Sequence, residues 1–232
     1  MIFIATPCYD AILLEHHMCV VNLIGYLSAK SIPYQYATLS DCNSMRSRAE
    51  MTETFMRSGM EYMLQIDSDM TFKPSDVMRL LSHKLPIVAG VYRKRKMDWD
   101  KVVAAIKMDD PNFAAYAEYT FVVDEEDTTM KNNVIKVKYA PTGFLMFHRD
   151  VIAKMINDHP ETKFKSPNQG EAHALYDNII KDGQYLSTDY SFCERATRSG
   201  FSIYADLSLK LDHVGLYVYE SNPSVLVKPR QA

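Results

Sequence analysis

The sequence predicts an α/β protein in which helices cover a mostly parallel, Rossmann-like sheet. Short apolar runs that fit buried strands alternate with longer segments whose apolar residues recur at helical spacing. The first three segments read strand, helix, strand at the spacing of a βαβ unit, which favours parallel pairing. With 232 residues, 47% of them hydrophobic, the chain is long enough for one α/β domain with its own core.

The first 96 residues are expected to alternate strands and helices. The apolar run 1–5 predicts a strand, followed by a loop over 6–10 in which Pro7 fixes the backbone angle φ. Helical spacing predicts a helix over 11–30, a second over 43–58 and a third that begins near Pro74. Apolar runs predict the other strands of this half at 34–39, 61–66 and 85–92.

The second half of the chain is less regular and is expected to include a small antiparallel excursion. Apolar runs predict strands at 101–107, 116–123, 134–137, 144–147 and 201–205. Helices are expected to begin at Asp150 and near a cap at Ser187 or Thr188. The polar stretch 158–185 is interpreted as a flexible loop or lid.

Two carboxylates follow a buried strand, since the apolar run 62–66 stops at Asp67 and Asp69. In an extended chain, side chains two residues apart point the same way, so both can converge on one cation. Open α/β sheets bind ligands beyond the carboxyl ends of their strands, and such oxygen ligands suit Mg²⁺ or Mn²⁺ carrying a phosphorylated substrate. The alternative is a strand-end turn with Asp as a local cap. A second triplet, Asp98-Trp99-Asp100, follows a charged run and is interpreted as a solvated loop.

Basic residues flank this predicted site. Arg46 and Arg48 lie in the first turns of the 43–58 helix, where a positive charge opposes the helix dipole. Contact with an anion or a base ring is one interpretation, and an exposed helix face is the other. The run Arg93-Lys94-Arg95-Lys96 follows a strand at the same sheet edge as the aspartates, which favours contact with phosphate or an acidic acceptor.

Composition narrows the classes of protein that fit. The net charge of −3 gives no reason to expect broad nucleic-acid binding. The four cysteines (Cys8, Cys19, Cys42 and Cys193) lack Cys-x-x-Cys spacing, which favours reduced thiols and a cytoplasmic location. No run reaches ~18 apolar residues, so no membrane span is expected, and no secretory signal pattern is found at the N-terminus.

The chemistry-bearing motifs occur in a fixed order along the chain. They are Thr6-Pro7, Asp41, Asn43 with Arg46 and Arg48, Gln65-Ile66-Asp67-Ser68-Asp69, Thr142-Gly143-Phe144-Leu145, the segment from Thr188-Asp189-Tyr190 to Arg195, and Leu211-Asp212-His213-Val214-Gly215. This order and spacing over residues 1–215 resemble GT-A-fold glycosyltransferases, and more narrowly the small family-2-like transferases of phages, large DNA viruses and bacteria. The chain departs from the family's Glu-Asp-x-Asp segment, because Thr188 and Ser191 replace two of its acids and leave Asp189.

The resemblance implies one GT-A domain, with a nucleotide-binding half at 1–96, an acceptor and catalytic half at 97–215 and a tail at 216–232. It implies a glycosyltransferase that moves a sugar from a nucleotide-sugar, most often a UDP-sugar, to a hydroxyl acceptor. The acceptor would be a glycan or another hydroxyl compound, a modified DNA base included. The implied cofactor is Mn²⁺ or Mg²⁺.

The resemblance also implies roles for individual residues. Asp69 and His213 would bind the metal, and Asp67 would touch the ribose or reach the metal through water. Asp189 would be the general base, which favours an inverting reaction. The nucleotide and its diphosphate would be held by Thr6, Pro7, Asp41, Arg48, Arg93 and Arg95.

Two other activities are compatible with the sequence. Nucleotidyltransferases and sugar-nucleotide pyrophosphorylases also use a metal and a nucleotide on an α/β sheet. They generally carry a Gly-rich loop after the first strand, where this chain has Thr6-Pro7-Cys8-Tyr9. A non-catalytic module that binds a nucleotide-sugar is the other alternative.

Overall fold

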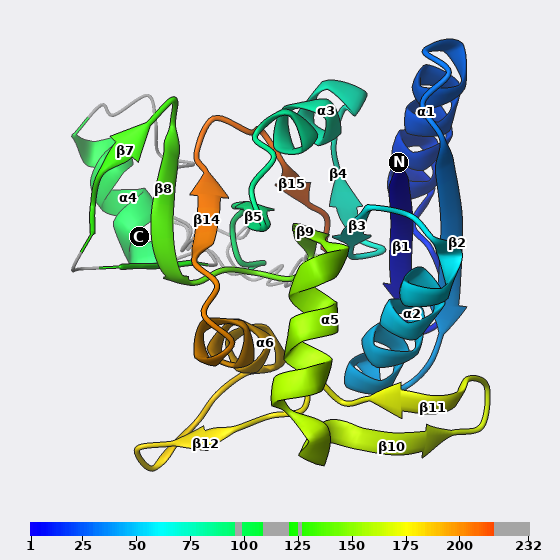
Figure 1. Ribbon diagram of the computed structural model, residues 1–232. Helices are drawn as coiled ribbons and strands as arrows, with labels where there is room; N and C mark the ends of the chain where they lie inside the picture. Colours follow the sequence, from blue (N-terminus) through cyan, green and yellow to red (C-terminus); the bar gives the residue numbers. More distant parts are fainter. Residues whose placement is uncertain (96–98, 109–120, 125–126, 216–232) are drawn as a thin grey trace, which may run out of the picture.

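Nine strands form one central sheet in the part of the chain that the structure describes (Figure 1). The computed structural model describes residues 1–95, 99–108, 121–124 and 127–215. In spatial order the strands are β2 (Tyr34–Ser40), β1 (Ile2–Cys8), β3 (Tyr62–Ile66), β9 (Phe144–His148), β5 (Ile87–Gly90), β14 (Ile203–Asp206), β8 (Val134–Tyr139) and β6 (Val122–Val123), with β7 (Met130–Lys131) also paired to β8. Strands β1, β2 and β3 are mutually parallel, β5 and β14 are parallel, and β9 runs antiparallel between β3 and β5. The predicted α/β class with a mostly parallel sheet is confirmed.

Helices pack on both faces of this sheet (Figure 1). The described helices are α1 (Leu14–Ala29), α2 (Ser44–Ser58), α3 (Pro74–Ser82), α4 (Trp99–Lys107), α5 (Arg149–Asp158) and α6 (Thr188–Arg198). Successive strand residues alternate between two buried clusters: Ile4 packs with residues of α1 and α3, and Phe3 packs with residues of α2, α5 and α6. Because both faces are buried, the strands read as continuous apolar runs, which is why the sequence located them.

Strand β1 is longer than predicted and includes most of the expected 6–10 loop. Residues 6–8 pair in parallel with residues 38–40 of β2. The pairing with β3 ends at Ala5, so Pro7 has a partner strand on only one side. A proline is tolerated there, since its missing N–H falls where the strand has become an edge.

The predicted strand at 101–107 is wrong, because α4 spans Trp99–Lys107. A short apolar run in the sequence does not by itself show whether the segment forms a strand or a helix. Here Asp100 in the first turn and Lys107 in the last complement the helix dipole. Asp100, from the second Asp-x-Asp triplet, therefore lies on a helix and is exposed, whereas Asp98 lies outside the described residues. Residues 116–120 and the tail 216–232 also lie outside the described residues.

The polar stretch 158–185 is not a structureless loop. It contains a 3₁₀ turn (Pro160–Thr162) and two hairpins, β10–β11 (Lys163–Ser166 and Gly170–His173) and β12–β13 (Ile180–Lys181 and Gln184–Tyr185). Glu50 of α2 is fully buried and accepts hydrogen bonds from Ser166 Oγ at 2.5 Å and Asn168 Nδ2 at 2.9 Å. Such side-chain contacts leave no periodic apolar pattern, so the sequence did not reveal the hairpins.

Two further expectations concern the whole chain. The cysteines are free thiols, as their spacing predicted. Within the described ranges, none of the helices is both long and apolar enough to cross a membrane.

A buried carboxylate ties the sheet to α3. Asp206, at the end of β14, is fully buried and accepts hydrogen bonds from Arg79 Nε at 2.6 Å, His83 Nε2 at 2.7 Å, and the N–H and hydroxyl of Ser208 at 2.8 and 2.6 Å. Burial alone would raise the pKa of Asp206, but the hydrogen bonds from Ser208, His83 and Arg79 outweigh it and hold the pKa below the ordinary 3.8.

Replacing this carboxylate is expected to destabilise the fold. Asp206→Ala should lower the free energy of unfolding by about 2–3 kcal/mol in urea denaturation at pH 7, somewhat below the usual cost of breaking a buried pair because Arg79 is 37% exposed. Since the folded pKa is the lower one, the carboxylate's contribution is present above pH 3.8 and is lost as the pH falls through the folded pKa. The difference in the free energy of unfolding between wild type and variant should therefore shrink in acid.

The exposed Asp158, paired with Lys154, is a control whose replacement should have a much smaller effect on the free energy of unfolding. An equal loss for both variants would contradict this account.

Candidate functional site

A cleft of ≈ 330 Å³ opens where the parallel strands β1, β2 and β3 end. Its lining comes from the end of β1, from the segments that follow β1, β2 and β3, from the start of α2 and from the basic run: Pro7, Cys8, Tyr9, Asp41, Cys42, Ser44, Ser47, Arg48, Asp67, Ser68, Asp69 and Arg95. The cleft thus lies at the carboxyl edge of the sheet, where open α/β sheets bind ligands. Asp41, Arg48, Asp67, Asp69 and Pro7 were all predicted as site residues.

Asp69 and His213 lie together although they are far apart in the sequence. The short strand β15 (Asp212–His213) pairs antiparallel with β4 (Met70–Thr71), and Val214 N–H donates to the Asp69 carbonyl at 2.9 Å. This pairing places His213 Nε2 3.3 Å from Asp69 Oδ2. Arg95 Nη1 lies 2.9 Å from the same oxygen, so Asp69 already has two polar partners.

The imidazole of His213 is held in one orientation. Its Nδ1 is 3.0 Å from the Arg93 carbonyl, which can only accept, so Nδ1 carries the proton and Nε2 faces Asp69. The ring also meets Tyr92 edge to face, with centroids 5.1 Å apart. Burial lowers the pKa of His213, but the hydrogen bonds to Asp69 and to the Arg93 carbonyl outweigh it and raise the pKa overall. When a histidine binds a metal through one ring nitrogen, the other ring nitrogen usually donates a hydrogen bond to a carbonyl or carboxylate, as Nδ1 of His213 does here.

Asp67 takes a different partner from Asp69. Its Oδ1 accepts from Arg48 Nη2 at 2.5 Å, and its N–H donates to the Gly143 carbonyl at 3.0 Å. Among the described residues, no three His, Cys, Asp or Glu side chains form a group that could hold a metal ion. The structure therefore brings Asp69 and His213 together and pairs the third predicted ligand, Asp67, with an arginine.

Arg48 has hydrogen-bond donors without acceptors. It is 6% exposed, and its Nε and Nη1 atoms are buried with no hydrogen-bond partner among the described residues. Burial disfavours its charge, but Asp67 and Asp189 nearby outweigh this and raise its pKa. A buried guanidinium with free donors at the wall of a cleft is costly unless an acceptor is supplied. An anionic ligand would supply one. Of the two sequence interpretations, contact with an anion fits the buried Arg48, whereas Arg46 is largely exposed and pairs with Asp41.

Asp189 lies in the first turn of α6 and is free of a capping role. Ser187 is the N-cap, and its hydroxyl accepts from Tyr190 N–H at 3.3 Å. The Asp189 carboxylate instead accepts a short hydrogen bond from the Thr142 hydroxyl. Burial raises the pKa of Asp189, and the opposing effects of Arg48 and Thr142 only partly offset it. Asp189 does not line the cleft itself, but it is close enough to interact electrostatically with Arg48 and Asp67.

The remaining predicted residues differ in their access to the cleft. Thr6 is fully buried, and its hydroxyl lies 3.2 Å from His16 Nε2, so its side chain does not line the cleft. Asp41 lines the cleft and accepts from Arg46 Nε and Nη2, both at 2.7 Å, and the Arg46 hydrogen bond lowers the pKa of Asp41 to about 2. Arg93 contributes its carbonyl, to His213.

Sequence reasoning missed several contributors. Cys8, Tyr9, Cys42, Ser44 and Ser47 line the cleft but carry no motif of their own. Their positions at or after the ends of β1 and β2, with Ser44 and Ser47 in the first turns of α2, were the available signal, because strand ends at one sheet edge lie together.

Comparison with known proteins places the fold. No protein-family model matches the sequence, and no curated protein sequence matches it significantly. Among solved structures, A197 from STIV is similar over 92% of this chain and 85% of its own, at 15% sequence identity and a TM-score of 0.50. The chain and A197 share a fold. A UDP-glucose pyrophosphorylase complexed with UDP-glucose is similar over 91% of this chain and 92% of its own, at 9% identity and a TM-score of 0.46. A fold alone does not assign an activity, which has to be argued from the site.

Proposed function

We propose that this chain is a glycosyltransferase that moves a sugar from a nucleotide-sugar, with UDP-sugars as the first donors to test, to a hydroxyl acceptor. One observation carries the proposal. Arg48, whose buried Nε and Nη1 have no hydrogen-bond partner among the described residues, lines the same cleft as Asp69 at the carboxyl edge of the sheet. His213 does not line this cleft, but it pairs with Asp69. Free cationic donors beside a carboxylate–imidazole pair are suited to a diphosphate accompanied by a divalent cation.

In the proposed reaction the acceptor oxygen attacks the anomeric carbon of the sugar. The bond from that carbon to the phosphate oxygen breaks, and the nucleoside diphosphate leaves with the bonding electrons. Asp189 accepts the proton lost by the acceptor hydroxyl, a role that a carboxylate of raised pKa performs well near neutral pH. A single displacement of this kind inverts the configuration at the anomeric carbon.

The residues of the cleft would act on the leaving group. Arg48 and Arg95 stabilise the negative charge that develops on the diphosphate. Mn²⁺ or Mg²⁺ held by Asp69 and His213, with Asp67 at the ribose or at the ion through water, would neutralise more of that charge. The Nδ1 hydrogen bond of His213 supports this assignment, because it leaves Nε2 directed at Asp69.

A donor screen tests the proposal. The purified protein is incubated with Mn²⁺ and a panel of nucleotide-sugars, and the released nucleoside diphosphate is measured. Release from at least one donor is expected. Pyrophosphate release from a nucleoside triphosphate and a sugar 1-phosphate would identify a nucleotidyltransferase instead. Nucleotide-sugar binding without any release, with acceptor glycans present, would identify a binding module.

Gly143 is expected to be required for the position of Asp67. A Cβ placed on Gly143 would lie 2.5 Å from Asp67 Oδ2 and closer still to the Tyr92 hydroxyl. Gly143→Ala should therefore displace the Asp67 carboxylate from Arg48, weaken UDP binding by roughly tenfold and destabilise the fold by about 1–3 kcal/mol. Titration calorimetry and urea denaturation would measure the two effects.

Gly25 provides the matched control for this substitution. It lies within α1, and a Cβ there meets nothing within 4 Å. Gly25→Ala should leave UDP binding unchanged and stabilise the helix by about 0.5–1 kcal/mol. If Gly143→Ala, like Gly25→Ala, left UDP binding unchanged and did not destabilise the fold, the close packing of Asp67 against residue 143 would not be needed to position Asp67.

A further inference from the structure

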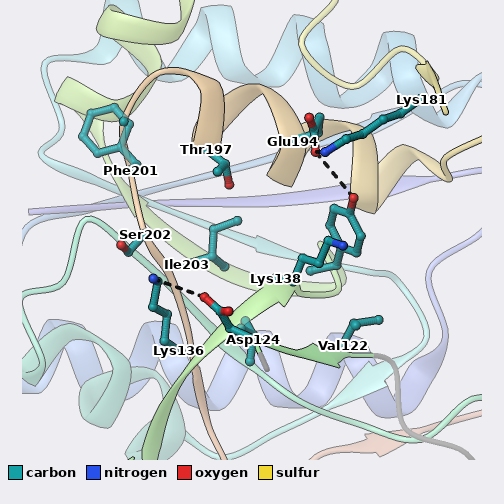
Figure 2. A pocket seen from close by; sticks show the side chains of 13 residues that line it. Val122, Asp124, Lys136, Lys138, Lys181, Glu194, Thr197, Phe201, Ser202 and Ile203 are labelled. Carbon is teal, nitrogen blue, oxygen red and sulfur yellow. Dashed lines mark hydrogen bonds and ion pairs between the residues drawn. The ribbon is translucent and has the colours of Figure 1, made fainter. Parts of the chain in front are cut away.

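A second pocket lies beside α6 (Figure 2). Its volume is ≈ 630 Å³, and it shares no lining residue with the cleft. It is formed by β8, by Val122 of β6 and the following Asp124, by Lys181 of β12, by the C-terminal half of α6 and by the turn that leads into β14. None of the roles assigned above uses it.

The charges of this pocket are nearly balanced. Figure 2 shows Lys136 paired with Asp124, and Lys181 paired with Glu194 on another side of the pocket. The N···O distances are 3.1 and 2.9 Å. Lys138 also lines the pocket, and among the described residues no carboxylate forms an ion pair with it. Its Nζ lies 5.5 Å from the centroid of the Tyr139 ring. The lining thus carries one lysine more than it has carboxylates, and Glu194 is also paired with Arg198, which does not line the pocket.

This balance bears on the class of ligand. A nucleic-acid backbone or a free diphosphate is bound by several uncompensated cations, which the pocket does not offer. A sugar hydroxyl both donates and accepts, so it is suited to a wall where ammonium groups and carboxylates lie side by side. Thr197 and Ser202 add hydroxyls that do both, and the rings of Tyr139 and Phe201 add apolar surface. Pockets that combine apolar surface with a few placed polar groups are typical of small-molecule sites.

Two stretches of chain connect this pocket to Asp189. The first is α6, which carries Asp189 in its first turn and Glu194 and Thr197 farther on, ~7 and ~12 Å along the helix axis. The second runs from Tyr139, which lines the pocket, to Thr142, which donates to Asp189. The two stretches touch, since the rings of Tyr139 and Tyr190 stack with centroids 4.4 Å apart and planes 12° apart.

We infer that this pocket binds a neutral oligosaccharide, which is the outer part of the acceptor whose terminal hydroxyl reaches Asp189. The inference rests on the proposed glycosyl transfer and adds the acceptor class to it. It follows from the balanced charges, the hydroxyl and aromatic lining and the two connections to the proposed base. It predicts a glycan, and not a modified DNA base, as the acceptor.

The test measures glycan binding without donor or metal, so its result does not depend on whether sugar transfer occurs. The full chain is applied to an array of neutral oligosaccharides, and the best binder is titrated by calorimetry. Lys138→Ala and Thr197→Val remove one polar group each at exposed positions of the pocket. Each should weaken oligosaccharide binding by roughly five- to tenfold while leaving UDP binding and the melting temperature unchanged.

Lys30→Ala is the matched control, because Lys30 is an exposed lysine at the end of α1, remote in sequence and absent from the pocket lining. It should bind the oligosaccharide like the wild type. Three results would overturn the inference: no glycan on the array binds, binding is unaffected by both pocket variants, or the pocket variants instead abolish salt-sensitive binding to single-stranded DNA. If no donor released its nucleoside diphosphate but the oligosaccharide still bound, the proposed sugar transfer would be excluded. The pocket would then remain a glycan-binding site.

Discussion

Asp69→Ala is expected to remove Mn²⁺-dependent donor binding and to lower the rate of nucleoside diphosphate release by roughly 10²- to 10³-fold. The Asp69 carboxylate lies against both His213 and Arg95. Its loss leaves the imidazole without a companion oxygen ligand and leaves Arg95 without its partner. Titration of UDP with and without Mn²⁺ should show a metal-dependent gain in affinity for the wild type and none for the variant.

The second Asp-x-Asp triplet supplies a control for this experiment. Asp100 has the same local spacing as Asp69, but it is exposed on α4 and lies outside the cleft lining. Asp100→Ala should keep the full metal-dependent gain. If Asp69→Ala also kept it, the assignment of the cation to the Asp69–His213 pair would have to be abandoned.

Asp189→Asn is expected to reduce sugar transfer by about 10²- to 10⁴-fold while leaving UDP binding intact. An amide cannot accept the proton of the acceptor hydroxyl at neutral pH, but it can still accept the hydrogen bond from Thr142. Single-turnover measurements at saturating donor would place the loss in the chemical step. Asp182→Asn, in the exposed turn between β12 and β13, is the matched control and should transfer at the wild-type rate.

The pH dependence follows from the same carboxylate. Because burial raises the pKa of Asp189, the transfer rate of the wild type should fall on the acid side with an apparent pKa above the ordinary 3.8. Ionisation of Asp189 therefore affects the stability of the fold in the opposite direction to ionisation of Asp206. A raised folded pKa means that ionised Asp189 opposes folding as the pH rises, so Asp189→Asn should not lower the melting temperature at pH 7. A variant that transferred at the full rate, or that lost activity only through unfolding, would exclude Asp189 as the base.

Parts of this site were predictable because they depend on local chain direction. Asp67 and Asp41 follow strands whose apolar runs are visible in the sequence, and parallel strand ends lie at one edge of a sheet. The nearness of His213 was implied by a family resemblance and not by any spacing. Helix α4 was mispredicted as a strand, because the five-residue apolar run 102–106 is compatible with either a strand or a helix. The hairpins of 163–185 were mispredicted as a flexible loop or lid, because polar side-chain packing leaves no periodic apolar pattern in the sequence.

By itself the sequence determined the α/β class, the order of most strands and helices along the chain, and the acidic pair at the end of β3, because burial on both sheet faces imposes continuous apolar runs on the strands. Only the tertiary structure decided which partner each carboxylate takes. Asp69 meets His213 through the β4–β15 pairing, and Asp67 meets a buried arginine instead. These partnerships join residues far apart in sequence, and they depend on side-chain direction and burial that exist only once the sheet has formed.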